Sequence, residues 1–222
     1  ASGCEDVEML FVDFASFESI KSVAAALTEK TTKIDILINN AGLFKQKYAE
    51  SVDGIEMTMA VNYFAPILLT KLLLPLLKKS EKARIVNVGS ELYRNGKIDI
   101  ENPFILANFN GNKAYANSKL LIAYFTKELA RQLENTTVTV NFLHPGVVNT
   151  GVFREFPKWV NAMLKLFILT PEKGAEPSIL LASSSEFEGV TGKYYKRLKQ
   201  TELAKCAQIS EFDALIWDKT EA

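Results

Sequence analysis

Short apolar runs of strand length alternate along this chain with segments that repeat apolar residues at helical spacing. Residues 34–38 are rich in β-branched side chains and almost wholly apolar, and residues 84–88 form a second apolar run of the same length. Strands that are apolar on both faces are typical of a parallel sheet with both faces covered. The alternation therefore predicts an α/β fold, a doubly wound parallel sheet with helices on both of its faces.

The remaining elements are predicted from the same two periodicities. Strands are expected at residues 7–12, 34–38, 84–88, 138–143 and 193–195. Helices are expected at residues 17–29, 54–79, 113–134, 157–169, 171–182 and 201–218. Ser16 is a candidate cap for the first helix, Pro66 and Pro75 are candidate kinks or breaks in the second, and the polar stretch 91–112 is expected to be a loop.

Composition excludes several classes of function. The chain has 222 residues, and 26 basic residues balance 26 acidic ones, so charge gives no argument for binding nucleic acid. Cys4 and Cys206 lie at opposite ends of the chain and form no metal or redox spacing, which favours a reduced intracellular protein. His144 is the only histidine, so no metal site is predicted, and a structural role for His144 is favoured over catalysis. With no repeat and no Gly, Pro or Ser-rich linker, residues 1–222 are predicted to form one domain.

Tyr115 and Lys119 form the pair that suggests chemistry. They are four residues apart on a predicted helix, so their side chains share one face. A phenol titrates near pH 10, and a neighbouring ammonium favours the phenolate. Tyr115 is therefore a candidate general acid or base. The pair alone is a weak signal, because many helices contain both residue types at this spacing.

Other polar residues follow the predicted strands. Residues 39–42 (Asn-Asn-Ala-Gly) end one strand, Gly89 and Ser90 end the next, and residues 144–146 (His-Pro-Gly) end a third. Asn62 lies in the helix between the first two. Ligands of parallel sheets bind at these carboxyl ends. Each residue also has an ordinary explanation, as a strand end, a turn or a cap, and only their joint order and spacing makes a functional site the better interpretation.

Taken together, these motifs resemble the short-chain dehydrogenase/reductase superfamily along nearly the whole chain. The resemblance rests on Asp13 after the first strand, residues 36–42 (Ile-Leu-Ile-Asn-Asn-Ala-Gly), Val61-Asn62, residues 85–90, residues 115–119 (Tyr-Ala-Asn-Ser-Lys) and residues 144–146. The long insert between Ser90 and Tyr115, the run 125–133 and the His-Pro-Gly motif look like the retinol-dehydrogenase-like branch. A Rossmann-like sheet is then the implied fold.

The resemblance implies a role for each residue. Tyr115 would exchange a proton with the substrate oxygen, Lys119 would lower the pKa of Tyr115 and hold the nicotinamide ribose, Ser90 would orient the carbonyl, and Asn62 would hold a water molecule in a proton relay. The cofactor, NADP or NAD, would contact Asp13, Asn39, Ala41, Gly42, Lys119, Pro145, Gly146, Val148 and Thr150.

The substrate is expected to be a small hydrophobic alcohol or carbonyl compound. Residues 152–169 are strongly apolar, and in the family this region tends to form a lid, so Phe153, Phe156 and Trp159 are candidate substrate contacts. The same residues fit simple packing on the sheet equally well. The resemblance also implies a homodimer as one assembly. It places the protein inside the cell, in the cytoplasm or, for a full-length form, on an organelle membrane.

One part of the family pattern is missing from this sequence. The family opens with a glycine-rich turn that holds the cofactor pyrophosphate, yet Gly3 is the only glycine before Asn39. We therefore expect a sheet that lacks its first two strands, and a first strand that pairs differently, detaches or leaves an exposed edge. A catalytically silent scaffold is the alternative function. An epimerase or dehydratase ranks last, because its substrate domain needs more chain.

Overall fold

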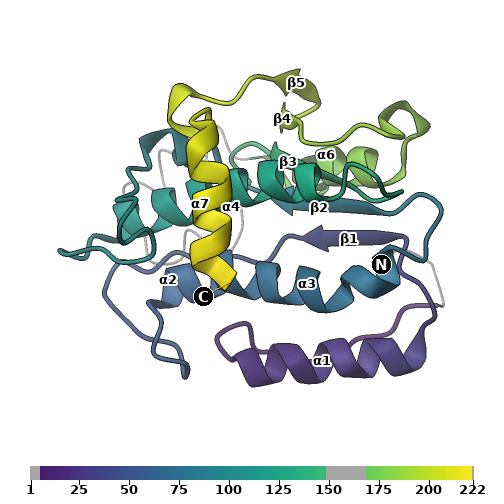
Figure 1. The fold of residues 1–222 in the computed structure, drawn as a ribbon, viewed down its shortest axis with the longest axis horizontal. Helices are drawn as coiled ribbons and strands as arrows, with labels where there is room; N and C mark the ends of the chain where they lie inside the picture. Colours follow the sequence, from purple (N-terminus) through teal and green to yellow (C-terminus); the bar gives the residue numbers. More distant parts are fainter. Residues whose placement is uncertain (1–5, 149–168, 222) are drawn as a thin grey trace.

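The computed structural model describes residues 6–148 and 169–221, and it confirms the α/β fold. Five strands form one sheet in the order β1-β2-β3-β4-β5. The strands are β1 (Ile36–Asn39), β2 (Arg84–Val88), β3 (Thr139–His144), β4 (Tyr194–Lys196) and β5 (Lys199–Thr201). The first four are parallel, and β5 runs antiparallel to β4. Figure 1 shows the sheet between its helices.

Helices cover both faces of the sheet, as the apolar strands predicted. The main core packs α4 (Gly111–Gln132) against side chains such as Ile85 and Phe142, with α1 (Phe17–Lys30) and α3 (Ala65–Leu77) extending that layer. The opposite face is covered by α6 (Pro171–Ser183), against Val86 and Leu143. Neighbouring residues along β2 and β3 therefore point into different cores, which explains why both strands are apolar throughout.

The N-terminal segment is the main departure from the expected elements. Residues 7–12 were predicted to be a strand, and this prediction is wrong: they run beside α1, joined to it by the Lys30–Glu8 ion pair, and form no ladder. Met9 is 92% exposed and Phe11 91%. A strand needs a partner, and β1 lies at the edge of the described sheet with its outer side open. Detachment and an exposed edge were two of the predicted outcomes.

The predicted helix 54–79 is divided into three parts. A short α2 (Met57–Met59) leads into a π-helical segment (Ala60–Phe64), and α3 follows. Pro66 is the second residue of α3, directly after the π-helical segment, and Pro75 lies inside α3 without ending it. Met57–Leu77 is long and apolar enough to cross a membrane, but buried core helices pass the same test, and 61% of the apolar window is buried.

The C-terminal region was predicted only in part. The expected helix 201–218 begins later, as α7 (Ser210–Glu221), because Thr201 pairs with Tyr194 in the unpredicted strand β5. In Figure 1, α7 crosses in front of α4. Trp217 of α7 stacks on Phe125 of α4, with ring centroids 5.6 Å apart.

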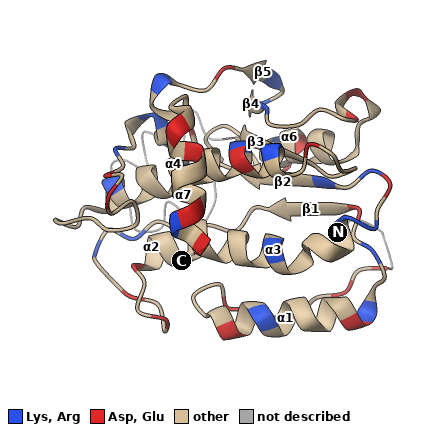
Figure 2. Ribbon diagram, viewed as in Figure 1, with Lys and Arg blue, Asp and Glu red and all other residues tan. Residues whose placement is uncertain are grey.

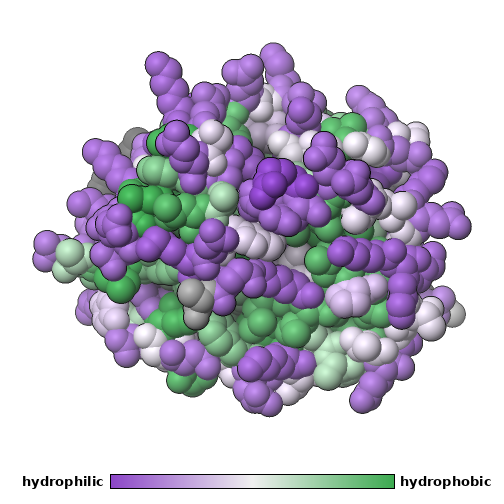
Figure 3. Space-filling model, in the orientation of Figure 1, coloured by the Kyte–Doolittle hydropathy of each residue, from purple (hydrophilic) through white to green (hydrophobic). Residues whose placement is uncertain are grey.

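The predicted polar stretch 91–112 also contains structure. It opens with a 3₁₀ helix, η2 (Glu91–Asn95), and α4 begins at Gly111, two residues earlier than expected, with Asn110 as its cap. Basic and acidic residues are interspersed over the helices and loops (Figure 2). Apolar atoms are visible along α3 above α1 in the space-filling view (Figure 3), where Leu72 is 37% exposed.

Candidate active site

The carboxyl ends of the parallel strands meet at one edge of the sheet. Asn39 ends β1, Gly89 and Ser90 follow β2, and His144 ends β3. The main-chain N–H of Gly89 donates to the carbonyl oxygen of Leu143 at 2.6 Å. A Cβ atom on Gly89 would lie 2.1 Å from the ring of Phe142, so only glycine fits at this turn. The close approach of the two strand ends fixes where Ser90 leaves the sheet.

Tyr115 reaches this edge from the first turns of α4. The helix can begin where it does because Gly111 lies against the main chain of Lys45, where a Cβ atom would approach the carbonyl oxygen to 2.2 Å. Tyr115 is buried, and the ring of Phe44 packs edge-on against it, with centroids 6.0 Å apart. Burial raises the pKa of the phenol, and a hydrogen bond with the Ser90 hydroxyl opposes that rise. Ser90 and Tyr115 are thus neighbours, and the catalytic roles predicted for them stay predictions.

Lys119 lies one helical turn further along α4 and is buried beside Tyr115. Its Nζ is 5.9 Å from the centroid of the Tyr115 ring and donates to the carbonyl oxygen of Val88 at 3.0 Å. Burial lowers the pKa of Lys119 to about 8. The expected lowering of the Tyr115 pKa by this ammonium is not confirmed: burial raises the pKa, and the effect that opposes it comes from the hydrogen bond with Ser90.

Asn62 lies in the π-helical segment, and both its side-chain oxygen and its side-chain nitrogen form hydrogen bonds. Oδ1 accepts from the N–H of Leu43 at 2.8 Å, while Nδ2 donates to the carbonyl oxygen of Leu43 at 2.9 Å and to Ser118 Oγ at 3.1 Å. The amide therefore clamps the loop after β1 to α4. Ser118 was missed by the sequence analysis, although it lies inside the Tyr-x-x-x-Lys motif. The water-holding role of Asn62 remains a prediction.

Gly42 brings the loop after β1 against both of these helices. A Cβ atom on Gly42 would lie 3.3 Å from Asn62 Oδ1 and 3.4 Å from Lys119 Nζ. The predicted residues Gly42, Asn62 and Lys119 are therefore neighbours in space. Ala41 is exposed just before this contact.

Two other predicted cofactor residues have structural partners. Asn39 donates through Nδ2 to Thr70 Oγ1 at 2.9 Å and to Asn87 Oδ1 at 2.8 Å, so its side chain joins β1 to α3 and β2. Asp13 accepts a hydrogen bond from the N–H of Ala15 at 2.9 Å in the turn before α1, and Asp13 is exposed. Their predicted cofactor contacts stay predictions.

The segment after β3 turns sharply over the end of the sheet. Gly146 has φ +101°, a conformation that favours glycine, and a Cβ atom there would lie 3.2 Å from Arg197 Nε. Val148 then bridges to Leu169. Pro145 lies between His144 and this turn, so residues 145–148 follow the carboxyl end of β3, and their predicted cofactor contacts stay predictions. The predicted residues Thr150, Phe153, Phe156 and Trp159 lie outside the described residues.

His144 is buried below the end of β3. Its side chain is 9% exposed, and its Nδ1 has no hydrogen-bond partner within residues 6–148 and 169–221. Burial lowers its pKa to about 4, so the imidazole is neutral at pH 7. A neutral, enclosed imidazole fits the structural role that the sequence favours. Across the described part of the chain, no three His, Cys, Asp or Glu side chains gather as metal ligands.

The residues thus brought together at one sheet edge are a tyrosine, a serine, a buried lysine and a glycine-lined loop. The family model for short chain dehydrogenases matches residues 2–161. The chain belongs to the short-chain dehydrogenase family.

Individual relatives agree with the branch predicted from the sequence. The chain is similar to retinol dehydrogenase 14 of Homo sapiens, with 41% identity over 226 residues, covering 99% of the chain and 67% of that protein. It is 39% identical over 215 residues to retinol dehydrogenase 13 of Homo sapiens, covering 93% of the chain and 65% of the relative. The chain therefore spans about two thirds of the length of these relatives.

Solved structures share the fold. A crystal structure of an uncharacterized protein from Mycobacterium Paratuberculosis superposes with a TM-score of 0.76 at 26% identity, covering 97% of this chain and 74% of that one. The active-site complex of Pseudomonas aeruginosa RhlG with NADP gives a TM-score of 0.65 at 28% identity, covering 83% and 73% respectively.

Proposed function

We propose that this chain contains the catalytic residues of an oxidoreductase that interconverts a hydrophobic alcohol and its aldehyde or ketone, using NAD or NADP. The observation that supports this most directly is the contact between Tyr115 and Ser90, with Lys119 buried directly beside the tyrosine. A phenol, a hydroxyl and an ammonium at the carboxyl edge of a parallel sheet are suited to moving a proton to or from a substrate oxygen.

The protonation states fit carbonyl reduction at neutral pH. Burial keeps the Tyr115 phenol protonated, so it can donate its proton to the oxygen of an aldehyde or ketone. Ser90, which hydrogen-bonds with Tyr115, also donates a hydrogen bond to the carbonyl oxygen of the substrate and so orients the substrate. Lys119 stabilises the negative charge left on Tyr115 after the proton has moved. In the oxidation of an alcohol the same proton returns to Tyr115.

The nicotinamide would lie against Gly42, Lys119 and Gly146. Because Gly42 has no side chain, the main chain of this loop comes close to Lys119 Nζ, so that one ligand could contact both the loop and the ammonium. When bound, the nicotinamide supplies or accepts the hydride at the substrate carbon. RhlG, which shares the fold, binds NADP, and this supports a nicotinamide cofactor here.

The substrate class is supported by the relatives. Retinol, named in both human relatives, is a hydrophobic alcohol. The apolar residues Phe153, Phe156 and Trp159 are the proposed contacts for its chain. Their replacement by alanine should raise KM for lipid aldehydes more than for short ones, and an equal effect on both would contradict this assignment.

The direct test is turnover by the purified chain with NADPH or NADH and a panel of aldehydes that includes retinal. Tyr115→Phe should lose at least about a hundredfold in kcat, since it removes the proton donor and little else. Tyr48→Phe is the matched control, because Tyr48 is 56% exposed and its hydroxyl hydrogen-bonds to Glu50. Turnover that survives in Tyr115→Phe would exclude the proposed mechanism. No turnover in the wild-type chain would favour the alternative of a catalytically silent scaffold.

A further inference from the structure

Glu91, which directly follows Ser90, has several partners that fix its position. Glu91 opens η2, a helix of five residues, and Ser90 caps it by accepting from the N–H of Leu92 at 3.3 Å. A single short 3₁₀ turn is weakly stabilised by its own hydrogen bonds. The position of Ser90 therefore depends on what holds η2 in place.

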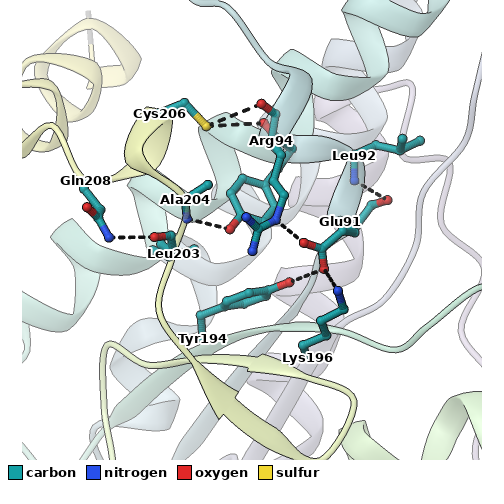
Figure 4. Close-up of polar contacts among 11 residues, drawn as sticks. Glu91, Leu92, Arg94, Tyr194, Lys196, Leu203, Ala204, Cys206 and Gln208 are labelled. Carbon is teal, nitrogen blue, oxygen red and sulfur yellow. Dashed lines mark hydrogen bonds and ion pairs between the residues drawn. The ribbon is translucent and has the colours of Figure 1, made fainter.

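Glu91 connects η2 to β4, more than a hundred residues later in the chain. Its carboxylate accepts from Lys196 Nζ at 3.1 Å and from the Tyr194 hydroxyl at 3.2 Å, and it forms an ion pair with Arg94 one turn along. Figure 4 shows these side chains converging on the one carboxylate. Partial burial would raise the pKa of Glu91, but the hydrogen bonds from Lys196 and Arg94 hold it below its usual value. Glu91 is therefore charged at neutral pH.

One of these partners on β4, Tyr194, is firmly packed. Tyr194 is 2% exposed, and its ring packs against Phe142 of β3 and Tyr93 of η2, with centroids 5.3 and 5.6 Å away. Tyr93 in turn accepts from the N–H of Ala204 at 2.8 Å. The Glu91 carboxylate thus ties the turn next to Ser90 to a fixed part of the sheet.

We propose that Glu91 is a positioning residue, which holds the Ser90 hydroxyl against Tyr115 through its contacts with Lys196 and Tyr194. The inference rests on the proposed function for its catalytic consequence, since Ser90 and Tyr115 are the groups that would meet the substrate oxygen. The positioning of Ser90 by Glu91 can be tested without measuring turnover. Loss of the carboxylate frees the turn, and the Ser90 hydroxyl then no longer stays at the phenol.

The test uses the ¹³Cζ chemical shift of Tyr115 in the full chain at pH 7, which reports the hydrogen bond at the phenol. Ser90→Ala defines the shift for complete loss of that bond. Glu91→Gln, Lys196→Met and Tyr194→Phe should each move the signal in the same direction as Ser90→Ala, with Glu91→Gln covering more than half of the change. Glu91→Gln removes a negative charge and Lys196→Met a positive one. If both variants move the Tyr115 signal in the same direction, the change reports the position of the Ser90 hydroxyl and not the altered charge.

Glu188→Gln is the matched control. It breaks another ion pair between distant segments, with Lys82 at 3.0 Å, at the opposite end of β2. It should leave the Tyr115 signal unchanged. Should Glu91→Gln fail to fold, Tyr194→Phe decides, because it keeps the buried ring and changes no charge.

Turnover of the aldehyde is the second measurement. In Glu91→Gln, kcat should fall about tenfold while KM for the aldehyde changes little, because the serine is displaced and not removed. A Tyr115 signal unchanged in Glu91→Gln or Tyr194→Phe would overturn the inference, and so would an unchanged signal in Ser90→Ala. A shifted signal in a chain without turnover would retain the positioning role and reject the proposed function.

Discussion

At the scale of single residues, the site contains a charge that is costly to bury. Lys119 is 5% exposed, and its Nζ donates to the main-chain carbonyl oxygen of Val88. Its pKa falls from 10.5 to about 8, because burial disfavours the ammonium. The folded chain therefore releases this proton at a lower pH than the unfolded chain does.

We expect Lys119→Met to make the protein more stable and less active. At pH 7 both folded and unfolded chains hold the proton, so the full cost of burying the charge is present. Between pH 8 and 10.5 the native state loses the proton first, and the stability of the wild-type chain rises with pH. After allowance for the lost hydrogen bond, the variant should gain about 2 kcal/mol at pH 7.

Denaturant unfolding at pH 7, 8.5 and 10 checks this expectation. The advantage of Lys119→Met over the wild-type chain should shrink steadily as the pH rises. A variant that is less stable at pH 7, or an advantage independent of pH, would show that the ammonium is not buried at a cost.

The sequence predicted which residues meet at the site but not how each is held. Ser90, Tyr115 and Lys119 could be predicted because strand ends and helix spacing determine their positions. Glu91 could not, since its partners Lys196 and Tyr194 are joined to it only by the folding of the sheet. The partners of Asn39 were missed for the same reason.

At the scale of elements, α7 is attached through several contacts, among them the Lys127–Asp213 ion pair and an aromatic stack on α4. Trp217 stacks nearly parallel on Phe125, at an interplanar angle of 7°, and Lys71 Nζ lies 4.8 Å from the Trp217 ring centroid. Ile216 is the buried residue of this helix. The stack therefore stabilises the docking of α7 on α4 and α3.

Trp217→Ala should reduce the free energy of unfolding by about 2–3 kcal/mol, less than for a fully enclosed tryptophan because this one is only partly buried. Leu215→Ala on the same helix is the control, since Leu215 is 38% exposed and should cost less than about 0.5 kcal/mol. Thermal unfolding of the two variants side by side measures the difference. Equal losses would mean that the stack does not hold α7.

Elements with one strong periodicity were predicted well, and those that depend on a distant partner were not. The strand 84–88 has the predicted bounds because it is apolar on both sides and enclosed on both sides. By contrast, residues 7–12 look like a strand in sequence but have no neighbouring strand in the described sheet. The hairpin of β4 and β5 was missed because it turns at Arg197, a non-glycine residue at φ 54°.

At the scale of the whole molecule, the site lies at one end of a sheet whose first described strand has an open side. Ile36 and Ile38 of β1 are 45% and 39% exposed. The proposed catalytic residues lie on α4 and at the end of β2, and the loops after β1 and β3 begin at the same edge of the sheet. We propose that this edge of the sheet forms a nicotinamide site.

A fluorescence titration of the purified chain with NADPH and NADH tests that claim most directly. Gly42→Val should weaken binding at least about tenfold, or 1.4 kcal/mol, because its side chain fills the space beside Lys119 and Asn62. Lys82→Gln, at the opposite end of β2, should bind as the wild-type chain does. Saturable binding that Gly42→Val weakens is the predicted result. Binding that is unaffected by Gly42→Val, or no binding at all by the wild-type chain, would contradict the claim.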